Sequence, residues 1–245
     1  TYPNKQVVQL ISSQIDVDRM DYLLRDAYFT GASYGKFDLT RILRVIRPIE
    51  NGIAFQQNGM HAVEDYVVSR YQMYMQVYFH PATRAMEVLL QNLLKRARTI
   101  YPDQKEYFQL TSPRLIPFFE EEVTIQDYLN LDDGVMNTYF QVWMDSPDTI
   151  LSDLAQRYIN RKVFKSILFT EDKRKDLVIL EKLIKEVGFN PTYYTAIHQN
   201  FDLPYDIYRP ELEKPRTQIE MIRKDGSLAE LSQLSPLVAA LAGTR

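Results

Sequence analysis

The stretch IDVDRMDYLLRDAYFTG, residues 15–31, decides the fold because it combines an apolar helical face with a dense polar one. At 100° per residue, Asp18, Tyr22 and Phe29 fall on one stripe of a helix, and Arg19 and Asp26 flank that stripe. The opposite face carries the apolar residues Met20, Leu24 and Ala27. This pattern predicts a helix that packs on a core through one side and presents a carboxylate, a guanidinium, a phenol and a second carboxylate on the other.

The polar face has the chemistry of a metal and phosphate site. An Asp beside an Arg can bind a hard cation with the carboxylate and a phosphate oxygen with the guanidinium. Tyr22 can stack on or hydrogen-bond to a sugar or base, and Asp26 can accept from a sugar hydroxyl. The alternative is a solvated face with i,i+4 ion pairs such as Asp21–Arg25. The pattern alone leaves both interpretations open.

Start and stop signals extend the helical reading along the first half of the chain. Ser13, with Asp16 three residues later, predicts an N-cap for a helix through about Phe29 that stops near Gly31. A shorter helix is expected from Asp38. The remaining expectations here are a hairpin around Asn51-Gly52 and a helical region over 62–101 that breaks at Pro81. Further helices are expected from Thr124 to Trp143 and from near Pro147 to Asn160.

The pattern changes after Asn160. The expected elements are a strand at 162–169, a helix at 176–188, a β-rich segment at 192–197, an extended loop at 201–216, a hairpin over 217–231 around Asp225-Gly226, and a short closing helix. The fold class predicted is mainly α, with a helical part over 1–160 followed by a smaller α+β lobe over 161–245 that contains antiparallel hairpins.

Composition excludes several classes of protein. The 245 residues carry 29 Lys and Arg against 32 Asp and Glu, a net charge of −3, so a general nucleic-acid coat is not expected. The absence of cysteine excludes disulfides and thiol nucleophiles. No apolar run has the roughly 18 residues of a membrane span, and no signal peptide is visible. We therefore expect a cytoplasmic protein with no membrane partner.

The polar helix also carries a resemblance to a known family. The run DVDRMDYLLRD (16–26), followed by an aromatic-Thr-Gly and by FDLTRIL (37–43), resembles the HD-domain deoxynucleoside triphosphate triphosphohydrolases, whose pattern reads D-V-D-[KR]-x-D-Y-x-x-R-D. The segment SRYQMYMQVYFHP (69–81) resembles the family's T-R-x-x-x-H-x-x-x-Y-x-H. The resemblance implies an HD-type helical core and hydrolysis of a dNTP substrate to deoxynucleoside and triphosphate.

The resemblance also assigns roles to individual residues. It implies that Asp18 is the last ligand of a divalent metal, which is not distinguished among Mg, Mn, Zn and Fe. Arg19 and Arg70 match phosphate-binding positions. The sugar-side positions are matched by Tyr22, by Asp26 as the reader of the 3′-hydroxyl, and by Tyr78. Tyr74 stands where some members have His, and its spacing from Arg70 and Tyr78 puts all three on one helical face.

The metal site that the resemblance implies is incomplete in this sequence. The family's His, His-Asp pair and final Asp are represented here by Asp18 alone, because His61, His80 and His198 are followed by Ala, Pro and Gln. We identify no catalytic residue in the chain. Either the chain is the C-terminal part of a longer enzyme that supplies the other ligands, which we favour, or it is a complete protein that has lost the metal.

Regulation and assembly follow from the same resemblance. Family members assemble as homotetramers and are activated by nucleotides bound between subunits. Arg41, Arg161 and Lys165 match basic positions of that regulatory site, so an allosteric nucleotide activator is a further expected partner. The alternatives to a dNTPase are a non-catalytic nucleotide-binding or oligomerisation module with the same fold, and a helical scaffold that binds another protein.

Overall fold

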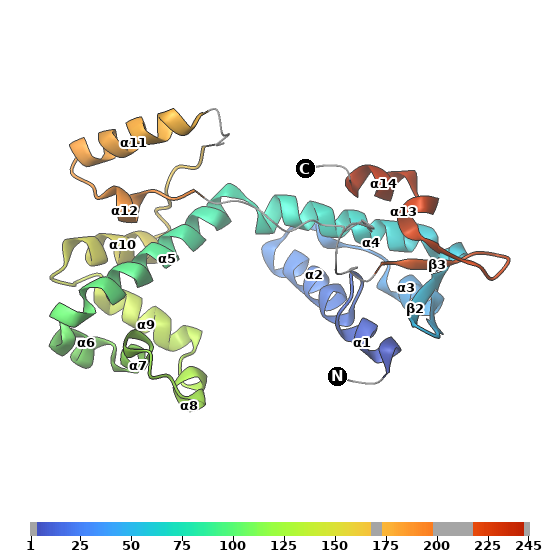
Figure 1. The fold of residues 1–245 in the computed structure, drawn as a ribbon, viewed down its shortest axis with the longest axis horizontal. Helices are drawn as coiled ribbons and strands as arrows, with labels where there is room; N and C mark the ends of the chain where they lie inside the picture. The colour runs from blue at the N-terminus through green and yellow to red at the C-terminus, as the bar shows by residue number, and fades with distance from the viewer. Residues whose placement is uncertain (1–3, 168–172, 198–217, 243–245) are drawn as a thin grey trace. The chain divides into compact units, whose positions relative to one another are not determined.

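A computed structural model describes residues 4–167, 173–197 and 218–242, and they form two compact units. The first unit comprises residues 1–80 together with 200–245, and the second comprises residues 81–199 (Figure 1). The domain boundary predicted at residue 160 does not coincide with this division. The C-terminal strands pair with the hairpin near residue 50, so both ends of the chain build the first unit.

The first unit contains helices and the one β-sheet found among the described residues. Its helices are α1 (Lys5–Ile11), α2 (Val17–Thr30), α3 (Leu39–Val45), α4 (Met60–Met73), α13 (Leu231–Leu234) and α14 (Pro236–Ala242). Its strands are β1 (Ile46–Ile49), β2 (Gly52–Gln56), β3 (Glu220–Ile222) and β4 (Leu228–Glu230). The predicted fold class, mainly helical with antiparallel hairpins, is confirmed.

The sheet joins two hairpins that are far apart in sequence. Its strand order is β1-β2-β3-β4, with antiparallel pairs at both sides and a parallel pair between β2 and β3. Phe55 stands at the centre, opposite Ile46 on one side and Met221 on the other. Both hairpins were predicted from their Asn-Gly and Asp-Gly turns, but the parallel pairing of β2 with β3 was not. β2 is buried along almost its whole length, as expected for a central strand.

The core of the first unit lies beneath α2 and α4. Leu23, Ile42, Val63, Tyr66 and Met73 are fully buried in it, together with the strand residue Met221. α2 approaches the turn after it closely: a Cβ on Gly35 would lie 2.7 Å from Ala27 Cβ and 2.8 Å from the Leu23 carbonyl oxygen. Gly31, at φ 72°, ends α2 in the left-handed conformation that glycine adopts without steric cost. α2 is therefore fixed along its buried side.

The start of α2 differs from the prediction. Asp16, and not Ser13, is the N-cap: its side chain accepts from the Arg19 backbone N–H at 2.7 Å. The Ser13 N–H donates to the second oxygen of Asp16 at 3.1 Å, so the spacing that suggested Ser13 as the cap reflects a turn held by Asp16. α1, which precedes this turn, was not predicted.

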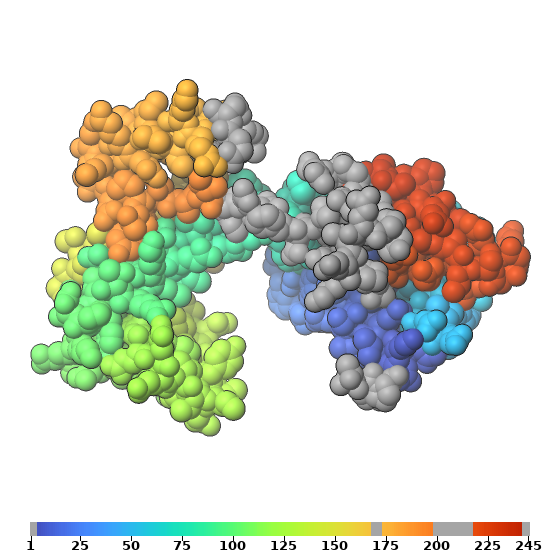
Figure 2. All heavy atoms as spheres, viewed as in Figure 1, coloured from blue at the N-terminus to red at the C-terminus, as the bar shows by residue number. Residues whose placement is uncertain are grey.

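The regular elements of the second unit are all helices among its described residues. Its helices are α5 (Pro81–Ile100), α6 (Lys105–Thr111), α7 (Ile116–Glu120), α8 (Ile125–Leu129), α9 (Asp133–Trp143), α10 (Thr149–Ile159), α11 (Arg174–Glu186) and α12 (Pro191–Tyr194). Trp143, Phe108, Leu89 and Leu154 are fully buried at its centre. α11 has no buried residue and packs on α12, so it forms an outer layer of this unit (Figure 1, Figure 2).

Several predicted elements in this unit are wrong or shifted. Residues 162–167 are irregular where a strand was predicted, and 168–169 lie outside the described residues, as does the predicted loop at 201–216. The β-rich segment at 192–197 begins instead as α12, because Asn190 caps a helix that has Pro191 in its first turn. The single helix predicted from Thr124 to Trp143 is two helices, since Asp132 caps a new one. The break at Pro81 is confirmed.

Candidate functional site

The polar face of α2 divides into solvent-facing and half-buried residues. Asp18 is exposed, whereas Arg19, Tyr22 and Asp26 are partly buried. Of the predicted stripe, Phe29 is 79% exposed at the end of the helix. Leu23 rather than Leu24 points into the core beside Met20 and Ala27. Three of the four polar residues named in the sequence thus lie along the edge where α2 meets the rest of its unit.

The ion pair expected for a solvated face is also present. Arg25 Nη1 lies 2.6 Å from Asp21 Oδ2, and both side chains are more than half exposed. An exposed i,i+4 pair contributes about 0.3–0.5 kcal/mol. It occupies a different side of α2 from the partly buried residues, so both interpretations of this helix describe part of it.

α4 and the turn that follows it carry the other residues of the site. Arg70 lies in the last turn of α4 and is buried. Tyr74 and Tyr78 bound a π-helical turn, η3 (Tyr74–Tyr78), in which the Phe79 N–H donates to the Tyr74 carbonyl at 2.7 Å. Such turns occur frequently at functional sites. The predicted α-helical spacing therefore ends at Met73, and the π turn sets the position of the two tyrosines.

Three tyrosines and one carboxylate from these elements lie in contact with one another. Tyr78 Oη donates to Asp26 Oδ2 at 2.6 Å. The Tyr78 ring packs edge-on against Tyr22, with 6.1 Å between ring centroids, and against Tyr74 at 5.2 Å. The structure therefore brings together Tyr22, Asp26, Tyr74 and Tyr78, from segments about 50 residues apart.

The phenols of Tyr22 and Tyr78 stay neutral. Burial raises the pKa of the Tyr22 phenol above its usual range, and hydrogen bonding to Tyr74 raises it further. Burial and the hydrogen bond to Asp26 raise the pKa of Tyr78 in the same direction. Deprotonation would place a second negative charge beside the Asp26 carboxylate. Tyr22 and Tyr78 thus present neutral aromatic side chains beside one carboxylate, that of Asp26.

The two arginines are held by backbone carbonyls. Arg70 Nη1 donates to the Gln14 carbonyl at 3.2 Å, and its guanidinium carbon lies 5.5 Å from the Tyr74 ring centroid. Its Nε is buried without a hydrogen-bond partner among the described residues. Arg19 Nη1 pairs with Asp16 and donates to the Ser13 carbonyl. Burial lowers the pKa of Arg19, but the charge and hydrogen bond of Asp16, together with the nearby phenols of Tyr66 and Tyr22, raise it by more in total, so the side chain keeps its charge.

The described residues do not fit a complete metal centre. No group of three or more His, Asp and Glu side chains comes together within the described ranges. Asp18 can offer one exposed carboxylate, and it makes no hydrogen bond or ion pair to another described residue. His61 is exposed and contacts Glu64 at 2.7 Å, His80 is exposed, and His198 lies outside the described residues. A single carboxylate does not hold a catalytic cation.

The predicted regulatory residues fall in different units. Arg41 belongs to the first unit and donates from Nη2 to the Asn58 carbonyl at 2.9 Å. Arg161 and Lys165 belong to the second unit and are exposed, and Arg161 has the left-handed φ of 53°. Their role in nucleotide activation stays a prediction.

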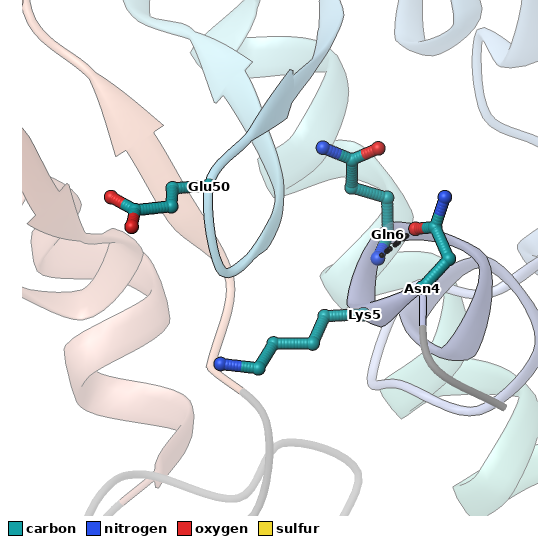
Figure 3. Close-up of a pocket in the computed structure, with 4 residues that line it drawn as sticks. All are labelled: Asn4, Lys5, Gln6 and Glu50. Carbon is teal, nitrogen blue, oxygen red and sulfur yellow. Dashed lines mark hydrogen bonds between the residues drawn. The ribbon is translucent and has the colours of Figure 1, made fainter. Parts of the chain in front are cut away.

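A separate hollow on the first unit includes none of the predicted residues. It is lined by Asn4, Lys5, Gln6 and Glu50 (Figure 3). Asn4 uses its side chain to accept from the Gln6 N–H at 2.9 Å as the cap of α1, and Lys5 donates to Asn51 at 2.8 Å. The first contact caps α1 and the second holds it against the first hairpin, so both are structural.

Sequence reasoning missed the residues that fasten the site together. Tyr66 is fully buried and donates to the Gln14 carbonyl at 2.8 Å, the same oxygen that accepts from Arg70. Asp16 is 2% exposed and holds Arg19. The signal for Asp16 was present as a capping spacing, but nothing in the sequence indicates that Tyr66 reaches the turn before α2.

Comparison with known proteins places the chain in a family. The family described as "HD associated region" matches residues 37–245. The uncharacterized protein YwfO of Bacillus subtilis is 49% identical over 246 residues, which cover 100% of this chain and 57% of that protein. A Dictyostelium discoideum protein named "Deoxynucleoside triphosphate triphosphohydrolase SAMHD1 homolog" is 24% identical over 79% of this chain and 35% of its own length.

Solved structures agree with this placement. A phosphohydrolase from Bacteroides thetaiotaomicron superposes with a TM-score of 0.75 at 27% identity, over 96% of this chain and 59% of that one. The chain spans about half the length of the curated relatives that it matches most fully. No helix among the described residues has both the length and the apolar character needed to cross a bilayer. The match over residues 37–245 shows that this chain belongs to the HD-associated region family.

Proposed function

We propose that this protein works as an HD-type phosphohydrolase that converts a dNTP and water to a deoxynucleoside and tripolyphosphate. The observation that carries the proposal is the hydrogen bond from Tyr78 to Asp26 beside the Tyr22 ring. It leaves one oxygen of a fixed carboxylate to accept from a 3′-hydroxyl, between aromatic faces that can pack on a deoxyribose. The names of the Dictyostelium relative and the Bacteroides phosphohydrolase support the same reaction class.

The arginines supply the phosphate side of the proposed site. Arg19 lies on α2 with Tyr22 and Asp26, and Arg70 lies in the last turn of α4, just before the η3 turn that carries Tyr78. The Arg70 Nε has no partner in the described part of the chain, and a buried unsatisfied donor is costly unless a ligand or water completes it. A triphosphate oxygen is a suitable acceptor, because charge-assisted hydrogen bonds to phosphate are strong.

The proposed reaction includes a divalent metal. We propose that Asp18 contributes one ligand of a divalent metal. Since the described residues supply no other cluster of ligands, a metal-dependent reaction requires ligands from outside them. Homotetramer assembly and activation through Arg41, Arg161 and Lys165 belong to the same proposal.

The reaction is tested by its products. The intact protein, incubated with each dNTP and a divalent metal, is expected to release deoxynucleoside and unbroken tripolyphosphate in equal amounts, measured by anion-exchange chromatography. Orthophosphate with a deoxynucleoside diphosphate would contradict the proposed bond cleavage. Because the described residues lack a complete metal site, a non-catalytic nucleotide-binding module is the second candidate, and dNTP binding without any product would favour it.

A further inference from the structure

The turn before α2 is fixed by a buried carboxylate. Asp16 is 2% exposed, and its Oδ1 accepts from the Arg19 N–H at 2.7 Å. Its Oδ2 accepts from the Ser13 N–H at 3.1 Å and also pairs with the Arg19 guanidinium. A buried carboxylate is tolerated only where such partners compensate for the loss of water. Asp16 therefore has a defined position and a defined charge partner.

The same turn is fastened from the side of α4. Tyr66 Oη and Arg70 Nη1 both donate to the Gln14 carbonyl, at 2.8 and 3.2 Å, and all three residues are buried. These two hydrogen bonds tie the turn to α4. Asp16 is thus anchored to the helix that carries Arg70, and it holds Arg19 relative to that helix.

Arg19 is held through one of its three guanidinium nitrogens. Both of its described contacts use Nη1, which pairs with Asp16 and donates to the Ser13 carbonyl. Its Nε and Nη2 make no hydrogen bond to another described residue, and its side chain is 33% exposed. A guanidinium has five donors in a rigid plane, so fixing one corner orients the rest. Fixing a flexible side chain before binding also reduces the entropy lost when a ligand binds.

We propose that Asp16 is a positioning residue, whose buried carboxylate holds the Arg19 guanidinium ready for a phosphate oxygen of the nucleotide. This inference rests on the proposed function. Asp16 itself is too buried to touch the ligand and acts through Arg19.

The capping role of Asp16 can be separated from its role toward Arg19. An N-cap needs one side-chain oxygen for a backbone N–H, and Asn serves as well as Asp. Asp132 does this alone: it accepts from the Val135 N–H at 2.8 Å at the start of α9, and it is exposed. With its amide oxygen toward the Arg19 N–H, Asp16→Asn keeps the cap, and its amide nitrogen replaces the oxygen that pairs with the Arg19 guanidinium and accepts from the Ser13 N–H. Asp132→Asn is the matched control for the cap.

The test measures the affinity of the intact protein for inorganic tripolyphosphate by titration calorimetry. Variants are Asp16→Asn, Arg19→Gln, their combination and Asp132→Asn. Asp16→Asn is expected to weaken binding about ten-fold, as for loss of one charge-assisted hydrogen bond, and Asp132→Asn is expected to leave it unchanged. In the Arg19→Gln background, Asp16→Asn should have no further effect, because contacting residues that act as a unit are not additive. Should Asp16→Asn fail to fold, Asp16→Glu keeps the charge, displaces the guanidinium and should weaken binding likewise.

Two results would overturn the inference alone. One is wild-type affinity in a folded Asp16 variant, and the other is a loss of affinity that persists undiminished in the Arg19→Gln background. A wild-type protein that neither binds tripolyphosphate nor releases it from dNTP would instead overturn the proposed function, and this inference with it.

Discussion

Replacing Asp18 with asparagine in the intact protein is expected to reduce bound divalent metal to background and to lower the rate of dNTP hydrolysis by more than about 100-fold, because even partners of metal ligands are worth about 10–100-fold in affinity or activity. The fold should survive the change. Asp18 is exposed and makes no hydrogen bond or ion pair to another described side chain, and a first-turn carboxylate contributes about 0.3–1 kcal/mol through the helix dipole.

Asp21→Asn is the matched control for this variant. Asp21 lies on the same helix, is exposed, and among the described residues pairs with the exposed Arg25. It should keep both metal and activity. Metal content is measured by mass spectrometry on purified protein, and folding by the thermal midpoint. Full metal occupancy in Asp18→Asn would remove the ligand role, whatever happens to the rate.

The second large effect is on the choice of sugar. The wild-type protein should use dNTP far better than rNTP, because a tyrosine ring packed beside C2′ in the proposed pose would leave no space for a 2′-hydroxyl. It should also use 3′-deoxy analogues poorly, because Asp26 then loses its hydrogen-bond donor. A buried polar group left unpaired costs about 1–3 kcal/mol, which corresponds to roughly 5- to 150-fold in kcat/KM.

Variants of the cluster separate the two preferences. Tyr22→Ala should relax the discrimination against rNTP, and Asp26→Asn should weaken the discrimination against 3′-deoxy analogues. Tyr22→Phe keeps the ring and should retain wild-type selectivity, so it controls for loss of the hydroxyl. The measurement is a competition assay with dNTP, rNTP and 3′-deoxy nucleotides. Equal discrimination by wild type, Tyr22→Ala and Asp26→Asn would return this cluster to a packing role.

Local signals in the sequence predicted much of the fold. Asn51-Gly52 and Asp225-Gly226 each predicted a hairpin that the structure contains, and Pro81 predicted the break after α4. These signals act through a few neighbouring residues, by fixing φ or removing a hydrogen-bond donor. The pairing of β2 with β3 joins Phe55 to Met221, and no local signal encodes a contact of that sequence separation.

Failed predictions have equally local causes. Residues 162–167 have strand-like composition but are irregular, and composition supplies no partner strand for pairing. In the segment after Asn190, a side-chain cap and a first-turn proline outweighed the β preference of its tyrosines. In both cases residue preference was overruled by the hydrogen bonds available to the backbone.

In the candidate site, too, local patterns were predicted from the sequence and contacts between distant residues were not. The i,i+4 pattern of α2 predicted which polar residues share a face, and the resemblance predicted that Tyr78 joins them. The hydrogen bond from Tyr78 to Asp26 depends on a π turn whose register the sequence pattern did not show. Likewise, the capping spacing was recognised but assigned to Ser13 as the cap, and the sequence did not show that Asp16 is the cap, that it is buried, or that it pairs with Arg19.

The central claim, that α2 and α4 form a deoxynucleotide site, is tested most directly by a crystal structure of the intact protein with a slowly hydrolysed α-phosphorothioate dNTP. We expect the deoxyribose to lie against the Tyr22 and Tyr78 rings, with its 3′-oxygen within about 3.2 Å of an Asp26 carboxylate oxygen. We expect the phosphates to lie beside Arg19 and Arg70. A nucleotide bound elsewhere, with no ligand between α2 and α4, would contradict it.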